Sequence, residues 1–64
     1  MNQQKIGKKL RDLRGTRTQK EVAMAVGVST MAISQYERGE RIPQDDIKIA
    51  LANYFKEPIG DLFY

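Results

Sequence analysis

The sequence contains neither cysteine nor histidine, and these absences exclude several classes of function. Without cysteine the chain cannot form disulfides, and without either residue it lacks the commonest ligands of soft metals. It also lacks the most frequent catalytic base and the thiol nucleophile. We therefore expect no metal, no cofactor and no enzymatic activity, and the absence of cysteine suits a reducing cytoplasm.

Long hydrophobic runs are missing as well. Met1 is followed by the polar stretch Asn2–Lys5, without the apolar segment of a secretory signal. The longest nearly apolar run, Val22–Val28, is far shorter than the roughly 20 residues that span a bilayer. We expect a soluble, cytoplasmic protein that contacts no membrane, and no small-molecule ligand is evident.

A chain of 64 residues predicts one small domain, residues 1–64, with a marginal core. Domains of this size often add disulfides, a metal or a second subunit. Because the composition excludes disulfides and the commonest metal sites, a second subunit is the remaining means of stabilising the fold, unless a small helical core is sufficient by itself.

Charge is distributed unevenly along the chain. Residues 1–20 carry seven basic groups and one acid, whereas residues 21–64 carry four basic and seven acidic groups. This asymmetry fits a polyanionic partner approached from one side, although a solvated helix face would give the same pattern.

Apolar residues recur at helical spacing, and no segment shows the alternation of a half-buried strand. Glycines, prolines and capping residues divide the chain into five helical patterns. They run over about Gln3–Arg14, from Thr18 until Gly27, over about Thr30–Arg38, from Asp45 until Lys56, and through Pro58–Leu62. We predict an all-α fold.

Local signals support these boundaries. Thr18 and Glu21 have the spacing of a capping box, and Ser29 can cap the third helix. Gly27 can take the left-handed conformation that ends a helix, and Pro58 suits a first helical position.

The stretch 19–38 is typical of two helices joined by a tight turn. Ala23 must be small where the second helix crosses the first, and Gly27 must take a positive φ for the chain to reverse. Apolar residues fill both inner faces, at Val22, Val26, Val28, Ile33 and Tyr36. The combined match predicts a helix-turn-helix, and the alternative is a helical hairpin that only packs.

The outward face of the third helix favours the first of these interpretations. An exposed structural helix usually carries Glu, Lys and Arg, whereas here the outward residues are uncharged: Thr30, Met31, Ser34 and Gln35. Such side chains can read the major groove of DNA, because Gln pairs with adenine, hydroxyls serve either partner, and apolar atoms contact the thymine methyl. Cations lie just outside this face, where phosphates would be, at Arg17, Lys20, Arg38 and Arg41.

A wider set of motifs runs through the chain. In order, they are Ile6–Arg14, Thr18–Gln19, Val22–Ala23, Val26–Ser29, Ile33–Gly39, Pro43 and Leu51–Phe55. Together they resemble the Cro/repressor-type helix-turn-helix family, also called the XRE family, over nearly the whole chain. The resemblance implies a compact five-helix bundle of the lambda-repressor type, dimeric binding to a palindromic operator in double-stranded DNA, and transcriptional control.

The resemblance also implies roles for the matching residues. Gln19 would contact a phosphate and buttress the third helix, and Ser29 would cap that helix and meet the DNA backbone. Base edges would be touched by Thr30, Met31 and Gln35, with Ser34 at the border, and phosphates by Arg38 and Arg41.

One further pair is implied in the same way. Arg14 and Glu37 match a pair that ties the first helix to the third. An ordinary surface ion pair there would contribute about 0–1 kcal/mol, so we assign the pair a structural role.

The sequence departs from the family around Arg17. The link Gly15–Arg17 is shorter than the usual pattern, and Arg17 stands where the family has an apolar residue. We expect Arg17 to gain a phosphate contact. Met31 is also unusual as a reader because it donates no hydrogen bond, and an exposed apolar residue at a dimer contact is the alternative.

The C-terminal residues supply both core and surface. We expect Leu62 in the core, and candidates for a two-fold dimer interface are Ile59, Phe63 and Tyr64. For Phe63 and Tyr64, core packing is an equally open interpretation.

These observations predict a sequence-specific DNA-binding transcriptional regulator, a repressor, that reads its operator as a homodimer with the third helix. The alternative is a protein-interaction module on the same fold, such as an antitoxin or an anti-activator. The basic N-terminal third of the chain favours DNA.

Overall fold

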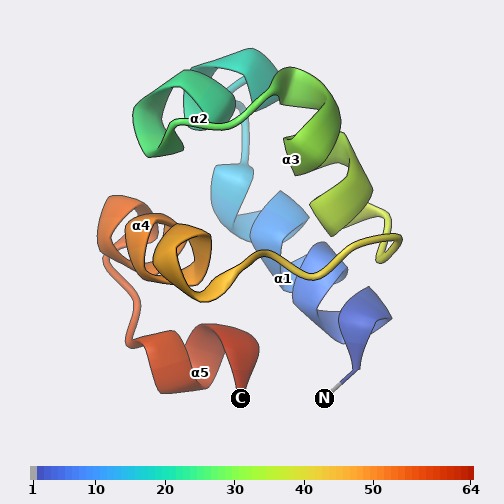
Figure 1. Ribbon diagram of the computed structural model, residues 1–64, viewed down its shortest axis with the longest axis vertical. Coiled ribbons are helices and arrows are strands. Elements are labelled where there is room, and N and C mark those ends of the chain that lie inside the picture. The colour runs from blue at the N-terminus through green and yellow to red at the C-terminus, as the bar shows by residue number, and fades with distance from the viewer. Residues whose placement is uncertain (1) are drawn as a thin grey trace.

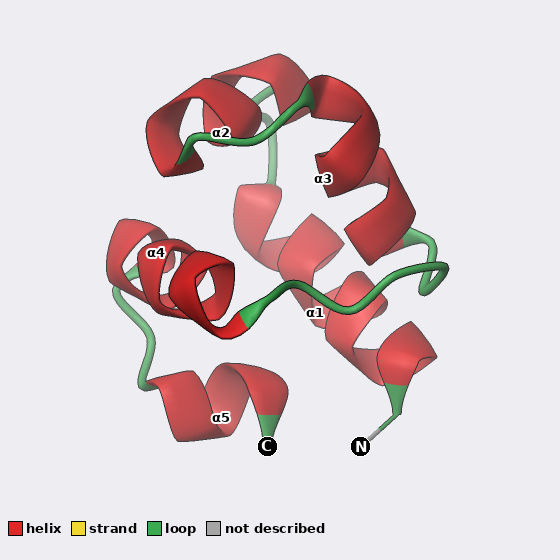
Figure 2. Ribbon diagram, viewed as in Figure 1, coloured by secondary structure: helices red, strands yellow, loops and turns green. Residues whose placement is uncertain are grey.

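The computed structural model describes residues 2–64, and every regular element in that range is a helix (Figures 1 and 2). The helices are α1 (Gln3–Arg14), α2 (Gln19–Val26), α3 (Thr30–Glu37), α4 (Asp45–Phe55) and α5 (Ile59–Phe63). The predicted all-α class is confirmed for these residues. Met1, which the predicted domain 1–64 includes, lies outside the described residues.

The helix boundaries differ from the predicted ones mainly at the last element. Pro58 was expected as its first helical residue, but its backbone is extended (φ −59°, ψ 135°) and it precedes the helix as the N-cap. At the end of α3, Arg38 is the C-cap, so the helix itself stops at Glu37.

Polar side chains cap the first three helices. Thr18 Oγ1 accepts a hydrogen bond from the amide of Glu21 at 3.0 Å, and Ser29 Oγ accepts one from Ala32 at 3.1 Å, as predicted. The reciprocal bond of the capping box, from the Thr18 amide to the Glu21 carboxylate, is absent from residues 2–64. Asn2, which the sequence analysis did not single out, caps α1 by accepting from the amides of Gln4 and Lys5.

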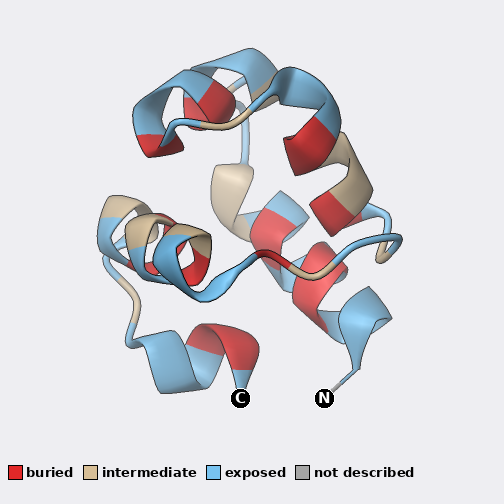
Figure 3. Ribbon diagram, viewed as in Figure 1, coloured by how far each residue is buried: buried red, intermediate tan, exposed pale blue. Residues whose placement is uncertain are grey.

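The helices surround a single apolar core. Helix α1 packs against α3 and α5, α2 packs against α3 and α4, and α4 packs against α5. In Figure 1, α2 and α3 form one end of the molecule and α5 the other. Figure 3 shows that the buried segments of all the helices face the space between them. The largest fully buried side chains are Val22, Leu51, Leu62 and Phe63.

Phe63 corrects one of the predicted interface residues. Its side chain is only 1% exposed, because α5 turns it towards α1 and α4, so it is a core residue and is not available to a second subunit. Ile59 and Tyr64 remain on the surface, with 37% and 74% exposure.

Lys48 is buried in α4, which nothing in the sequence pattern indicated. Its ammonium group donates a hydrogen bond to Tyr64 Oη at 3.0 Å and lies 4.8 Å from the centre of the Tyr64 ring. The carboxylate of Asp45 is 3.9 Å away. Lys48 therefore ties the last residue of the chain to α4. No helix within residues 2–64 is long and apolar enough to cross a membrane.

Two helices end in the left-handed conformation, with different residues. Gly27 ends α2 at φ 81°, as predicted, and a glycine takes this conformation without steric cost. Lys56 ends α4 at φ 58°, where a non-glycine residue costs about 1 kcal/mol. The turn between α2 and α3 therefore has a glycine at the position that requires the left-handed conformation.

Gly7 determines how closely α1 approaches α3. A Cβ atom at this position would overlap the carbonyl oxygen of Glu37 and would lie 2.6 Å from that of Tyr36. Both clashes involve backbone atoms, which cannot rotate away. Only glycine therefore lets the two helices pack at this distance.

Replacing Gly7 by alanine should lower the free energy of unfolding by about 1–3 kcal/mol, although alanine is the better helix former. Urea denaturation followed by circular dichroism measures the effect. The matched control is Gly60→Ala in α5, where the added Cβ meets no atom within 4 Å. This control should be neutral or slightly stabilising, and equal effects of the two substitutions would contradict the close packing of α1 on α3.

Candidate nucleic-acid interface

Helices α2 and α3 form a rigid pair joined by residues 27–29. The inner side of α2 is buried at Val22, Ala23 and Val26, and the inner side of α3 at Ile33 and Tyr36. The amides of Gly27 and Val28 both donate to the carbonyl of Ala23, at 2.9 and 3.0 Å, which closes the turn. The predicted helix-turn-helix geometry is present.

The outward face of α3 brings the predicted base readers together. Thr30 is exposed, Met31 is 68% exposed, and Ser34 and Gln35 are half-buried. None of the four carries a charge, so this face offers hydroxyl, amide and thioether groups only.

Polar and basic residues surround this face. Lys20 is exposed on α2, and Ser29 is exposed at the start of α3. Arg41 is exposed in the loop that follows α3, and its guanidinium lies over the ring of Tyr36, 5.7 Å from the ring centre.

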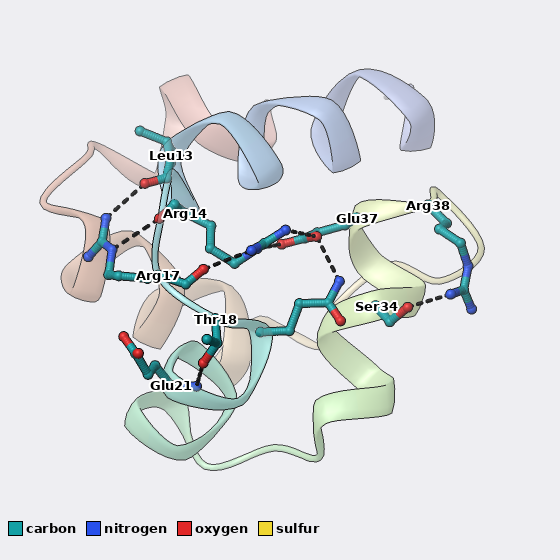
Figure 4. Close-up of polar contacts among 9 residues, drawn as sticks. Leu13, Arg14, Arg17, Thr18, Glu21, Ser34, Glu37 and Arg38 are labelled. Carbon is teal, nitrogen blue, oxygen red and sulfur yellow. Dashed lines mark hydrogen bonds and ion pairs between the residues drawn. The ribbon is translucent and has the colours of Figure 1, made fainter.

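The carboxylate of Glu37 fixes the position of α3 (Figure 4). It accepts hydrogen bonds from Arg14 Nε at 2.6 Å and from a second Arg14 nitrogen at 3.1 Å, and Gln19 Nε2 donates to it at 3.0 Å. The Glu37 side chain is only 5% exposed and that of Arg14 only 19%. One carboxylate therefore joins α1, the first residue of α2 and the last turn of α3.

This network is much more buried than the surface ion pair that the sequence left open. The hydrogen bond to Glu37 raises the pKa of the Arg14 guanidinium above its ordinary value, against the opposing effect of burial. Arg14 also donates to the carbonyl of Arg17 at 2.7 Å. Within residues 2–64 no buried side-chain nitrogen or oxygen lacks a partner, so the network is fully satisfied.

Arg17 turns inward instead of toward solvent. Its guanidinium donates to the carbonyls of Leu13 at 2.8 Å and Arg14 at 3.2 Å, which satisfies the end of α1 (Figure 4). It also lies over the rings of Tyr54 and Phe55, 5.1 and 5.2 Å from their centres. Arg17 thus occupies the place of the family's apolar residue by stacking on aromatic rings, a different role from the predicted phosphate contact.

Arg38 is held at the end of α3 by two neighbours. Its guanidinium makes two hydrogen bonds to the Glu40 carboxylate, each 3.0 Å long, and a third to Ser34 Oγ. The pair is about half exposed. The hydrogen bond from Arg38 holds the pKa of Glu40 below its ordinary value, so the pair is intact at neutral pH. Arg38 therefore lies beside the outward face of α3, next to Ser34.

A comparison with protein families agrees with this geometry. A family model described as helix-turn-helix matches residues 8–62. The chain belongs to the Cro/XRE-type helix-turn-helix family. A comparison with curated proteins found no match.

Membership in this helix-turn-helix family makes the protein a DNA-binding transcription regulator. The matched region extends from α1 into α5, so it includes the Glu37 network, the turn and the outward face of α3. The predicted DNA-contacting residues of this helix-turn-helix protein, apart from Arg17, lie on α2 and α3 or in the segments directly before and after α3.

Three features of the site were missed from sequence. The resemblance implied that Gln19 buttresses the third helix, but not that its partner is Glu37, because the two residues are 18 positions apart and no local pattern reports the contact. The inward turn of Arg17 follows from aromatic residues on α4, which its own segment does not show. The sequence places Arg38 and Glu40 two residues apart, but opposite charges at this spacing are too common to predict an ion pair.

Replacing Glu37 by glutamine should lower the free energy of unfolding by about 2 kcal/mol, because Arg14 and Gln19 lose a charged acceptor in a buried place. For a domain of this size the melting temperature would fall by roughly 10 °C. The matched control is Glu40→Gln, which breaks a solvent-exposed pair and should leave the stability nearly unchanged. A Glu37→Gln variant as stable as Glu40→Gln would contradict the central role of this carboxylate.

Proposed function

We propose that the protein is a sequence-specific transcriptional repressor that binds an inverted-repeat operator as a homodimer, with α3 in the major groove. One observation carries the proposal: the exposed face of α3 is uncharged, fixed by a buried network, and bordered by basic residues. An α-helix fits the width of the major groove of B-DNA.

The residues of this face offer the chemistry that base reading requires. The amide of Gln35 can bind adenine with two hydrogen bonds, and the hydroxyls of Thr30 and Ser34 can donate or accept. Met31 offers apolar atoms. Because α3 is fixed by Glu37, these groups meet the groove with little loss of conformational freedom on binding.

Phosphates would be contacted around this face. The proposed contacts are Gln19, Lys20, Ser29, Arg38 and Arg41, together with the amides at the start of α2 and α3, which favour anions. Arg17 is left out of this set, because its guanidinium is turned inward onto the carbonyls of α1 and the aromatic rings of α4. Arg38 is also hydrogen-bonded, but its side chain remains 54% exposed. Gln19 can serve both partners, since only one of its amide hydrogens is used by Glu37.

The proposed dimer interface uses the exposed apolar residues near the C-terminus. Ile59 and Tyr64 belong to it, with Ile49 of α4 as an additional exposed apolar residue. A two-fold dimer would place two α3 helices about 34 Å apart, in successive major grooves. Such a dimer covers one face of the operator, and this supports repression by steric exclusion.

Selection of tight binders from a randomised duplex pool, at near-physiological salt, tests the proposal. The expected result is enrichment of one inverted repeat whose half-sites are separated by one helical turn. A pool that stays random would show that the protein binds DNA only through non-specific electrostatics and would contradict the proposal.

Replacing Gln35 by alanine should weaken binding to the selected operator by about 1–3 kcal/mol and leave binding to random DNA nearly unchanged. Fluorescence anisotropy with both duplexes measures the two affinities. The matched control is Gln44→Ala, because Gln44 is an exposed glutamine that precedes α4 and makes no side-chain capping bond. Equal losses on both duplexes would remove Gln35 from the base-reading set.

Replacing Arg38 by glutamine should weaken binding to every duplex and lower the slope of log affinity against log salt by about one unit for each bound monomer. Lys56→Gln is the control for charge alone, because Lys56 is an exposed cation at the end of α4 and belongs to neither α2 nor α3. If the two variants had the same slope, Arg38 would not be a phosphate contact.

A further inference from the structure

Met31 occupies a central position on the reading face. It lies in the first turn of α3, the part of a reading helix that reaches the bases. With 3.6 residues per turn, Met31 projects between Thr30 and Gln35 around the helix axis. Its side chain is 68% exposed, so the core does not use it. Any duplex that meets Thr30 and Gln35 must therefore also meet Met31.

The chemistry of methionine restricts what Met31 can meet there. Its thioether donates no hydrogen bond and accepts only weakly. In the major groove, base edges present hydrogen-bond donors and acceptors, except for the C5-methyl group of thymine. A methionine pressed against the polar edges would displace water from groups that it cannot satisfy, which is unfavourable. The thymine methyl is the largest apolar feature of the groove, so it is the partner that an apolar side chain can bind with least cost.

We propose that Met31 recognises the C5-methyl group of a pyrimidine in each half-site, and that it thereby determines specificity for thymine at that position. The inference rests on the proposed function, since it requires α3 to lie in the major groove. It extends to 5-methylcytosine, which presents the same methyl group at the same place. It excludes uracil and unmethylated cytosine as equivalent partners.

The chain supplies a matched control for this residue. Met24 has the same side chain and similar exposure, 74%, but it lies on the outward side of α2 and not on α3. Both residues are exposed, so replacing either by alanine removes no buried contact. The two variants differ only in whether the lost thioether belongs to the reading face.

The experiment uses the operator obtained by selection. Each thymine of one half-site is replaced in turn by uracil, which removes only the methyl group, and the affinities of the wild type, Met31→Ala and Met24→Ala are measured by anisotropy. At one position the wild type and Met24→Ala should lose about fourfold in affinity, which corresponds to about 0.8 kcal/mol for one buried methyl-sized group. Met31→Ala should be nearly insensitive to the same replacement.

A second comparison uses cytosine at the identified position. Adding the C5-methyl group to this cytosine should raise the affinity of the wild type by a similar factor and leave that of Met31→Ala unchanged. Identical uracil profiles for the wild type and Met31→Ala would overturn the inference, as would equal weakening of Met31→Ala on every duplex, the behaviour of a dimer contact. A pool without an enriched site would overturn the proposed function itself, which distinguishes the two failures.

Discussion

The carboxylate of Glu37 lies where the first three helices meet, and the arrangement of α3 depends on it. It accepts three hydrogen bonds, two from Arg14 and one from Gln19, in a place from which water is largely excluded. Gly7 allows the same junction to close, because any side chain there would collide with the backbone of α3. The Glu37 carboxylate thus holds α3 through hydrogen bonds. The lack of a side chain at Gly7 lets α1 pack directly against α3.

This junction explains how so small a domain can present a defined surface. The core consists of few apolar side chains and contains no disulfide. The polar network adds directional contacts that apolar packing lacks, and every buried polar side-chain atom within residues 2–64 is satisfied. The outward face of α3 takes no part in this network, and of its four uncharged residues only Ser34 makes a side-chain hydrogen bond, to Arg38. The charged residues Arg38 and Arg41 follow this face in the sequence and are not part of it.

The fold and much of the site could be predicted from local sequence signals. The helix limits followed from residues such as Thr18, Gly27 and Ser29, whose effects act within one turn. Contacts between distant helices could not be predicted in this way. Arg17 was predicted to contact a phosphate, because nothing near it in the sequence indicates its packing on Tyr54 and Phe55. For Phe63, the sequence left core and interface open, and only the position of α5 shows that it is buried.

The central claim is that the outward face of α3 contacts DNA, and a titration of the isotopically labelled protein with a DNA duplex tests it most directly. Amide chemical shifts in two-dimensional NMR spectra report which residues meet the added duplex. The account predicts that the largest changes occur at residues 30–35 of α3 and at the start of α2. Changes confined to α4 and α5, with α3 unaffected, would contradict it, and the absence of any change would favour the protein-interaction alternative.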